Sequence, residues 1–276
     1  MRIRIVDAFT DRPFAGNPAA VVLLDSGPFP GDDRLQKLAA EVNLSETAYA
    51  RPLPESSEAD WALRWFTPVT EVNLCGHATL ATAHVLRSAG AAARTIRFAT
   101  RSGILTAETA ADGSITLDFP TAPLTELPVG EDVRAALGAD VLSAHDTGPN
   151  VGDLLVELAD EKTVRTLTPD LTAVARLGHR GVIVTAQASE DGGGRGAYDY
   201  VSRFFGPAVG IDEDPVTGSA HTALAPLWSG RLGRESLTGL QASARTGLVR
   251  TTVRGDRTLL TGDAVTVIDG ELLAGP

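Results

Sequence analysis

The sequence contains a single cysteine among its 276 residues, so it cannot form an internal disulfide, and this fits a reducing compartment. No stretch reaches the 18 or more apolar residues of a membrane span. Residues 1–5 run directly into an alternating strand pattern, without the apolar segment that follows the basic start of a signal peptide. We therefore expect a cytoplasmic protein without membrane contact.

Positive charge is in short supply, with 24 Lys and Arg against 35 Asp and Glu, for a formal net charge of −11 at pH 7. Nucleic-acid phosphates require a basic surface, so no nucleic-acid partner is expected. The acidic excess does not identify a substrate, because solvated surface carboxylates account for most such excesses. A 28.8 kDa chain is long enough for one large or two medium domains.

Several signatures of active sites are absent. The sequence has no Gly-x-Ser-x-Gly elbow and no dinucleotide fingerprint, and the glycines of 192–196 do not follow the strand-to-helix pattern of a phosphate loop. None of the five histidines is paired with a carboxylate or cysteine at metal-ligand spacing, so we expect no metal. Ser219 and His221 are two residues apart on an expected helix and point in different directions, which excludes a direct nucleophile–base pair.

What the sequence does contain is a long repeat. Residues 64–68 (RWFTP) lead through an acidic loop to 75–81 (CGHATLA), and residues 203–207 (RFFGP) lead through a more acidic loop to 217–223 (TGSAHTA). The two copies lie about half the chain apart. Repeats of this length predict two copies of one folding unit that face each other. We therefore expect an active site in the crevice between two pseudo-symmetric halves.

Each copy ends in a helix that begins with a glycine and small residues. A glycine lets the backbone approach a ligand closely, and the first-turn N–H groups of a helix have no partners within the helix. With the helix dipole, these groups favour an anion such as a carboxylate. Gly76 and Ala78 in the first copy, and Gly218 and Ser219 in the second, are the candidate substrate-binding residues. The alternative is two ordinary helix caps, with Ser219 as the capping residue.

Periodicity and turn residues predict a strand-rich chain with an apolar helix in each half. The two prolines of 120–123 mark the boundary between an N-terminal half, 1–119, and a C-terminal half, 124–276, whose last element packs back on the first half. Expected helices are 32–42, 78–89, 131–137 and 220–229. Expected strands are 2–9, 19–24 (antiparallel to the first), 46–51, 60–66, 95–99, 103–110, 114–119, 153–158, 181–186, 198–205 and several within 241–273, with a hairpin tip at 189–196.

Five segments, in order and covering nearly the whole chain, resemble the PhzF family of phenazine-biosynthesis-like proteins. These segments are 7–22 (DAFT and PFAGNPAAVV), 43–48 (NLSETA), 74–81 (LCGHATLA), 212–221 (DEDPVTGSAH) and 241–245 (QASAR). The sequence departs from the family at 246–247, where Thr-Gly replaces the usual Gly-Gly. This departure concerns a turn more than catalysis.

The resemblance implies an α+β fold similar to diaminopimelate epimerase, in which each half is a barrel-like sheet around a central helix. It implies an isomerase that uses no cofactor and no metal, and forms a homodimer. The family's namesake moves a proton within a dihydro-hydroxyanthranilic acid. By the same resemblance Glu46 is the general acid/base, and His77, Asp214 and Ser219 lie beside the substrate.

The residues themselves make this assignment chemically sensible. A group that moves a proton between carbons must act as a base and then as an acid, and a desolvated carboxylate suits both steps. Glu46 stands in an apolar segment beside Leu44 and Ala48. From the residues alone, a capping or ion-pairing glutamate is the more common role, and the resemblance reverses that preference.

The other candidates have ordinary alternatives as well. Asp214 belongs to an acidic cluster that resembles a solvated loop, but it directly precedes the turn into the second apolar helix, where it could orient a substrate amine or the ring of His77. His77 could be a core histidine, although its place after Gly76 favours substrate contact. The role of Cys75 stays open: its counterpart in the second half is Thr217, which disfavours a two-cysteine racemase, and a small buried residue is expected.

The sequence therefore predicts an isomerase that acts on a small carboxylated substrate through Glu46. An epimerase, racemase or dehydratase of an amino or hydroxy acid is an alternative, because one base at a carbon acid serves all three reactions. A small-molecule or partner-binding protein that kept the fold without catalysis is a further alternative.

Overall fold

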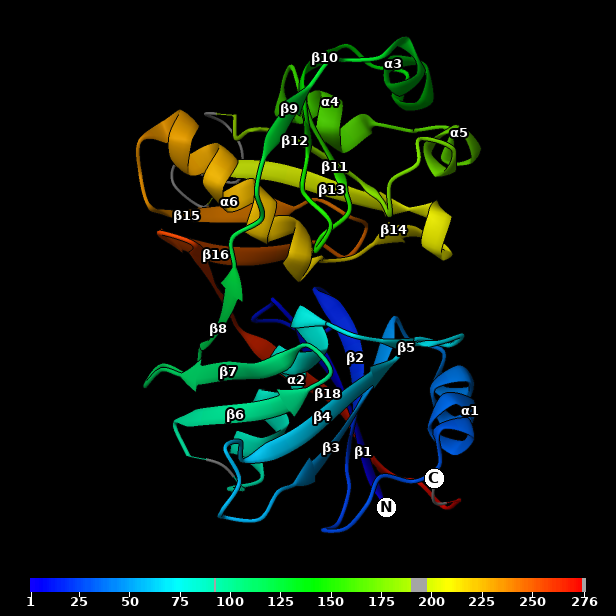
Figure 1. The fold of residues 1–276 in the computed structure, drawn as a ribbon, viewed down its shortest axis with the longest axis vertical. Helices are drawn as coiled ribbons and strands as arrows, with labels where there is room; N and C mark the ends of the chain where they lie inside the picture. The colour runs from blue at the N-terminus through cyan, green and yellow to red at the C-terminus, as the bar shows by residue number, and fades with distance from the viewer. Residues whose placement is uncertain (92, 190–197, 275–276) are drawn as a thin grey trace. The chain divides into compact units, whose positions relative to one another are not determined.

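The computed structural model describes residues 1–91, 93–189 and 198–274. The chain divides into two units (Figure 1). Unit 1 contains Met1–Asp118 and the C-terminal segment from Thr261, and unit 2 contains Phe119–Leu260. The chain passes between them in β8 (Ile115–Pro120) and β17 (Arg257–Gly262), which pair with each other. No helix among the described residues is both long and apolar enough to cross a membrane.

Unit 1 is a curved sheet around helix α2 (Gly76–Ser88) (Figure 1). The helix packs against β1, β2, β3, β7 and β18, and its buried residues lie on all sides, as expected for a central helix. The paired strands run in the order β18, β1, β2, β3, β4, β6, β7, β8, with β5 beside the end of β4. Helix α1 (Asp32–Val42) packs against β3 and β4. The strands are β1 (Arg2–Ala8), β2 (Asn17–Leu23), β3 (Glu46–Pro52), β4 (Trp61–Phe66), β5 (Glu71–Val72), β6 (Thr95–Thr100), β7 (Gly103–Thr109) and β18 (Ala264–Glu271).

Unit 2 repeats this plan around helix α6 (Gly218–Leu232). Its strands pair in the order β9, β10, β11, β12, β13, β15, β16, with β14 beside β13. One face of the sheet packs on α6, and the other buries a second apolar cluster under three short helices. The elements are β9 (Thr125–Leu127), α3 (Glu131–Leu137), β10 (Val141–Asp146), β11 (Leu154–Leu158), α4 (Glu161–Thr166), α5 (Leu171–Ala175), β12 (Val182–Gln187), β13 (Tyr200–Gly206), the 3-10 turn η1 (Pro207–Val209), β14 (Ile211–Asp214), β15 (Ser236–Gln241) and β16 (Gly247–Arg254).

The two units share one pattern of strand pairing. Strand β2 is parallel to β3 and β4 is parallel to β6, and in unit 2 β11 is parallel to β12 and β13 is parallel to β15. The pairs between them are antiparallel in both units, including β3–β4 and β12–β13. The repeat in the sequence therefore corresponds to two copies of one topology.

A pair of arginines shows that the repeat extends to side-chain contacts. Arg64 makes a two-pronged ion pair with Glu71, and Arg203 makes the same pair with Glu213, with N···O distances of 2.6–2.9 Å. Each guanidinium also lies over the aromatic ring two residues further on, at 5.1 Å for Phe66 and 4.8 Å for Phe205. Each ion pair joins a long strand, β4 or β13, to the short strand that follows it before the central helix, β5 or β14.

Most elements predicted from the sequence are present with small changes at their ends. Helices 32–42 and 131–137 have the predicted limits, and β2 is antiparallel to β1. Both apolar helices begin two residues earlier than predicted, at Gly76 and Gly218, and α6 extends to Leu232. It ends there because Gly233 adopts a left-handed φ of 65°, which closes a helix without strain. The predicted hairpin tip at 189–196 lies, except for Ser189, outside the described residues.

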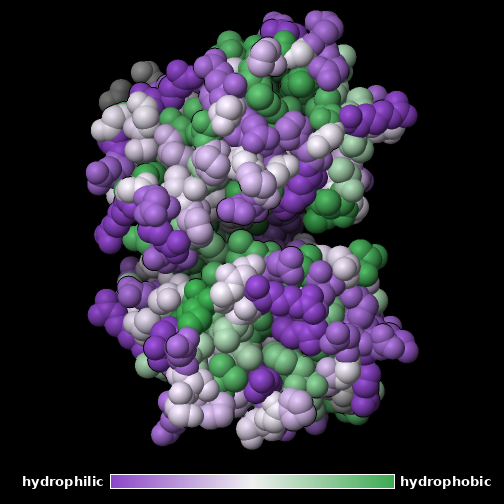
Figure 2. All heavy atoms as spheres, in the orientation of Figure 1, coloured by the Kyte–Doolittle hydropathy of each residue, from purple (hydrophilic) through white to green (hydrophobic). Residues whose placement is uncertain are grey.

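Hydrophilic and hydrophobic residues are interspersed over the face shown in Figure 2. This agrees with a composition of 43% hydrophobic and 21% charged residues. Buried apolar side chains gather instead along α2, around α6, between α1 and its strands, and beneath α3, α4 and α5.

Candidate functional site

The first group of candidate residues gathers at one edge of the unit 1 sheet. Strands β2 and β3 are parallel, with Ala19 opposite Glu46, so both strands begin at the same edge. Asn17 is the first residue of β2 and Glu46 the first of β3. The N-terminus of α2 supplies His77 to the same place. Residues from three distant segments therefore meet there because of the parallel register.

Glu46 and His77 form the centre of this group. Nε2 of His77 lies 3.1 Å from Oε2 of Glu46, and only 6% and 12% of the two side chains are exposed. Oε2 is shielded from solvent and has no well-angled hydrogen bond to any described residue. The pair thus combines a buried carboxylate, whose oxygen has unused lone pairs, with an imidazole at ion-pair distance.

Asn17 and Ser45 complete the contacts of His77. The Asn17 amide nitrogen lies 3.2 Å from Nδ1 of His77, and the Ser45 hydroxyl donates to the Asn17 amide oxygen at 3.3 Å. An amide that donates to Nδ1 makes Nδ1 an acceptor, so a neutral ring carries its proton on Nε2, facing Glu46. A protonated ring needs an acceptor at Nδ1 instead. The Asn17 amide can supply it by turning over, because the Ser45 hydroxyl can either donate or accept.

Cys75 lies beside the same ring. Its sulfur is 3.6 Å from Nδ1 and 4.0 Å from Nε2 of His77, and the residue is 6% exposed. Burial, and then repulsion from Glu46, raise the pKa of the thiol to about 11, so Cys75 is a neutral thiol near pH 7. The prediction that Cys75 is buried is confirmed. Thr217 is its structural counterpart, since each residue is the N-cap of its central helix without a capping side-chain bond.

The charge state of His77 follows from its neighbours. Burial by itself lowers the pKa of His77, but attraction to Cys75 and Glu46 outweighs burial and raises the pKa well above its ordinary value. Because the thiol is neutral near pH 7, we attribute the stabilisation of the imidazolium there to Glu46. The site therefore favours an imidazolium beside a carboxylate.

The same three side chains could hold a metal ion. One ligand atom from each of Glu46, Cys75 and His77 lies within 4.8 Å of the others, and this donor set suits Zn²⁺. The sequence expectation of no metal rested on spacing along the chain, which does not reveal this trio. The sulfur is almost equally far from both ring nitrogens. The Cys75 sulfur therefore lies beside the ring, between the two nitrogens. An ion bound by Nε2 would sit in line with that nitrogen, and the sulfur does not lie around that position.

The second group of candidate residues lies in unit 2, at the start of α6. The Thr217 hydroxyl donates to Oδ2 of Asp214 at 2.5 Å, and both residues are 7% exposed. Gln241 is fully buried and joins the turn together. Its amide nitrogen donates to the Asp214 carbonyl and to the Thr217 hydroxyl, and its amide oxygen accepts from the Thr217 N–H. The Ser243 hydroxyl donates to the Pro215 carbonyl. The 241–245 segment therefore fixes the shape of the turn into α6.

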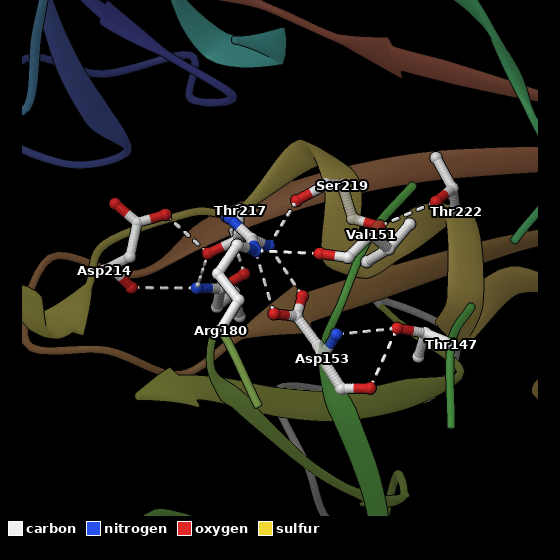
Figure 3. Close-up of polar contacts among 9 residues, drawn as sticks. Thr147, Val151, Asp153, Arg180, Asp214, Thr217, Ser219 and Thr222 are labelled. Atoms are coloured by element: carbon white, nitrogen blue, oxygen red, sulfur yellow. Dashed lines mark hydrogen bonds and ion pairs between the residues drawn. The ribbon is translucent and has the colours of Figure 1, made fainter. Parts of the chain in front are cut away.

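Ser219 has a different environment from the one a capping residue would have. The N-cap of α6 is Thr217, and the Ser219 hydroxyl instead lies 3.0 Å from a guanidinium nitrogen of Arg180 (Figure 3). Arg180 makes a two-pronged ion pair with the fully buried Asp153, at 2.9 and 2.6 Å. Sequence reasoning did not identify Arg180 or Asp153, because neither belongs to a motif and Arg180 stands 39 positions from Ser219.

The predicted substrate-binding positions thus fall into two groups. Gly76, Ala78 and His77 lie in the first turn of α2, and the Ala78 side chain is completely buried, so it can offer a ligand only its backbone. Gly218 and Ser219 lie in the first turn of α6, after Asp214. The residues that the sequence did not single out are Asn17, Ser45, Asp153, Arg180 and Gln241.

Two strand-rich units, each wound around a central helix, define a mixed α+β protein with a diaminopimelate-epimerase-like fold. Solved structures with low sequence identity agree on the fold: a hydroxyproline epimerase from Agrobacterium vitis superimposes with a TM-score of 0.60 at 14% identity, over 98% of this chain and 91% of that one. More specifically, the chain belongs to the PhzC/PhzF family of phenazine biosynthesis-like proteins, whose model matches residues 6–270.

Relatives with higher identity agree with this assignment. An uncharacterized isomerase of Pseudomonas aeruginosa is 46% identical over 271 residues, which cover 97% of this chain and 96% of that protein. The human phenazine biosynthesis-like domain-containing protein is 41% identical and covers 99% of both chains. The crystal structure of a PhzF-family protein from Enterococcus faecalis has a TM-score of 0.89 at 39% identity, covering 99% of both chains. The chain is therefore an isomerase- or epimerase-like member of this family.

Proposed function

We propose that this protein is an isomerase that moves a proton between carbon atoms of a small carboxylated substrate, with Glu46 as general acid/base and without a cofactor. The observation that carries the proposal is the buried Oε2 of Glu46, which lies 3.1 Å from Nε2 of His77 and has no well-angled hydrogen bond to any residue that the structure describes. A carboxylate with unused lone pairs, beside an imidazole that can carry a proton, is suited to accepting a proton from carbon and returning it.

The reaction balances without a redox partner. Oε2 of Glu46 removes a proton from one carbon, the C–H electron pair shifts through the conjugated system of the substrate, and the protonated Glu46 returns the proton at another carbon. The first-turn N–H groups of α2 and the imidazolium of His77 stabilise negative charge that develops on the substrate. Asn17 holds the ring of His77 in place during both steps.

We further propose that the first turn of α6 contributes substrate-binding groups. Gly218 supplies backbone N–H groups, Ser219 a hydroxyl, and Asp214 a carboxylate toward a substrate amine. The repeated helix-start motif and the family membership support this assignment. By the same family argument, we propose a cytoplasmic homodimer. Its molar mass in solution, measured by light scattering, tests the dimer directly.

The first experiment follows deuterium. The purified protein is incubated with 2,3-dihydro-3-hydroxyanthranilic acid in deuterated water, and the products are analysed by mass spectrometry and NMR. We expect conversion with deuterium at the new C–H position, and a loss of at least about 10²-fold in rate for Glu46→Gln. Glu41→Gln is the matched control, because Glu41 is an exposed glutamate on α1.

The other outcomes of this experiment separate the alternatives. Conversion that does not depend on Glu46 contradicts the assigned base. Exchange at the α-carbon of amino or hydroxy acids, in place of conversion of the aromatic substrate, indicates an epimerase, racemase or dehydratase. Binding of ligands without any exchange indicates a binding protein that kept the fold.

A further inference from the structure

Arg180 is held more firmly than an ordinary surface arginine. Its Nε donates to Oδ1 of Asp153 and to the Val151 carbonyl, both at 2.9 Å, and its Nη2 donates to Oδ2 of Asp153 at 2.6 Å (Figure 3). The guanidinium also lies over the ring of Phe204, 5.2 Å from its centroid. Asp153 is completely buried, so its carboxylate depends on Arg180 for charge compensation. The orientation of the guanidinium is therefore fixed by the fold.

This fixed group determines how the Ser219 hydroxyl can act. Nη2 of Arg180 lies 3.0 Å from Oγ of Ser219, and an arginine can only donate. Oγ must accept this bond, so the hydroxyl proton points elsewhere. No described residue accepts it. The Ser219 hydroxyl is thus a hydrogen-bond donor whose proton has no acceptor among the described residues. It lies in the first turn of a helix whose N–H groups also donate.

The Nη1 edge of the Arg180 guanidinium also carries donors without a described partner. The bonds of the guanidinium to described residues use Nε and Nη2, and leave the two N–H groups of Nη1 without a described partner. The Arg180 side chain is 38% exposed while that of Asp153 is wholly buried, so Arg180 is the member of the ion pair that is open to a ligand. Two oriented donors, the Ser219 hydroxyl and Nη1 of Arg180, match the two oxygens of a carboxylate.

We propose that Arg180 is a positioning residue that makes the Ser219 hydroxyl an obligatory donor, and that the Arg180–Ser219 pair binds the carboxylate of the substrate. This inference rests on the proposed function for the class of substrate. The pair selects an acid over the same molecule without its carboxyl group. It does so mainly through directed hydrogen bonds, since Asp153 already balances the charge of Arg180.

Binding measurements test this pair without any turnover. The probes are 3-hydroxyanthranilate and 2-aminophenol, the same ring without the carboxylate, titrated calorimetrically into the wild-type protein, Arg180→Ala and Ser219→Ala. We expect Arg180→Ala to weaken binding of the acid about tenfold or more and binding of 2-aminophenol less than about twofold. Ser219→Ala is expected to have little further effect in the Arg180→Ala background, because the arginine acts partly through that hydroxyl.

Two controls address folding and nonspecific charge effects. Arg231→Ala removes an arginine of the same unit whose side chain is 53% exposed, and it is expected to leave both affinities unchanged. Because Arg180→Ala leaves Asp153 unpaired, the double variant Arg180→Gln/Asp153→Asn removes both charges together and is expected to reproduce the selective loss. Equal weakening of both probes, no weakening, or failure of the wild-type protein to bind the acid overturns the proposal. The deuterium experiment with Glu46→Gln judges the proposed function separately.

Discussion

Nε2 of His77, in the first turn of α2, lies 3.1 Å from Oε2 of Glu46, the first residue of β3. Each side chain is almost fully buried, and the unused lone pairs of the carboxylate make this contact the chemical centre of unit 1. The contact also links the protonation of His77 to the stability of the fold.

The first prediction concerns stability as a function of pH. Burial lowers the pKa of His77, but attraction to Cys75 and Glu46 raises it well above the ordinary value of 6.5. A pKa raised in the folded state means that the folded protein binds the proton more tightly than the unfolded chain does. The contribution to stability is therefore full below about pH 6.5 and is lost as pH rises through the folded pKa of His77. Urea unfolding between pH 5 and 9 measures it.

His77→Gln is expected to remove this part of the pH dependence, whereas His179→Gln, at a half-buried position in unit 2, should retain it. An unchanged slope in His77→Gln would mean that the imidazolium is not stabilised by folding.

The second prediction concerns the ring orientation of His77. Asn17→Ala removes the amide that contacts Nδ1, so the ring of His77 is held less firmly, and kcat is expected to fall about tenfold or more while KM changes little. Above the pKa of His77, where the ring is neutral, both tautomers become accessible in this variant, and the ¹⁵N NMR shifts of the ring report them directly. Ser45→Ala, which leaves the amide in place, should have a smaller effect. A wild-type tautomer in Asn17→Ala would refute the role of the amide.

The third prediction concerns the single cysteine. Burial, followed by repulsion from Glu46, raises the pKa of Cys75 to about 11 from an ordinary value of 9.0. The neutral thiol is favoured by folding, so its contribution to stability is full below about pH 9 and is lost as pH rises through 11. Iodoacetamide should label the native protein slowly near pH 7 and the urea-unfolded chain rapidly. Because the chain has no other cysteine, the Cys75→Ser variant has no thiol to label and serves as the negative control. Fast labelling of the native protein at pH 7 would contradict the assignment.

The fourth prediction uses the duplicated arginine. Arg203 pairs with Glu213 and also donates to the carbonyls of Val164 and Leu167. Arg203→Ala leaves these acceptors without partners and is expected to lower the free energy of unfolding by about 2–4 kcal/mol. Arg231→Ala, which breaks a more exposed pair, should cost about 0–1 kcal/mol. Chemical denaturation measures both, and similar losses would show that burial of the Arg203 pair is unimportant.

The fifth prediction concerns the departure from the family at 246–247. Thr246 has a left-handed φ of 58°, a conformation that is strained for a β-branched residue and open to glycine. Thr246→Gly is therefore expected to raise the free energy of unfolding by about 0.5–1 kcal/mol, after the greater freedom of glycine in the unfolded chain is subtracted. The same change at Thr252, within β16, should destabilise by a similar amount. A loss of stability in Thr246→Gly would show that the side chain outweighs the strain.

Local sequence patterns accounted for most of the elements. Alternating apolar residues predicted β1 and β4, helical spacing predicted the limits of α1, and the repeated motifs predicted two apolar helices with glycine at their starts. The predicted limits of both helices nevertheless began two residues after Gly76 and Gly218, because glycine has a low helix propensity and the apolar pattern starts at Ala78 and Ala220. Short elements such as β14 and α5 were missed, since a few residues carry too little periodicity to stand out.

The sequence by itself determined the family, the duplication and the positions of Glu46, His77, Asp214 and Ser219, because each belongs to a segment whose order and spacing along the chain can be read directly. Only the tertiary structure decided which side chains touch them. The parallel register of β2 and β3 places Asn17 where it contacts His77. In unit 2, α6 packs on its sheet, and Ser219 at the start of this helix contacts Arg180. Such contacts depend on hydrogen bonding and packing between segments far apart in the chain, and local periodicity reports only which face of an element is buried.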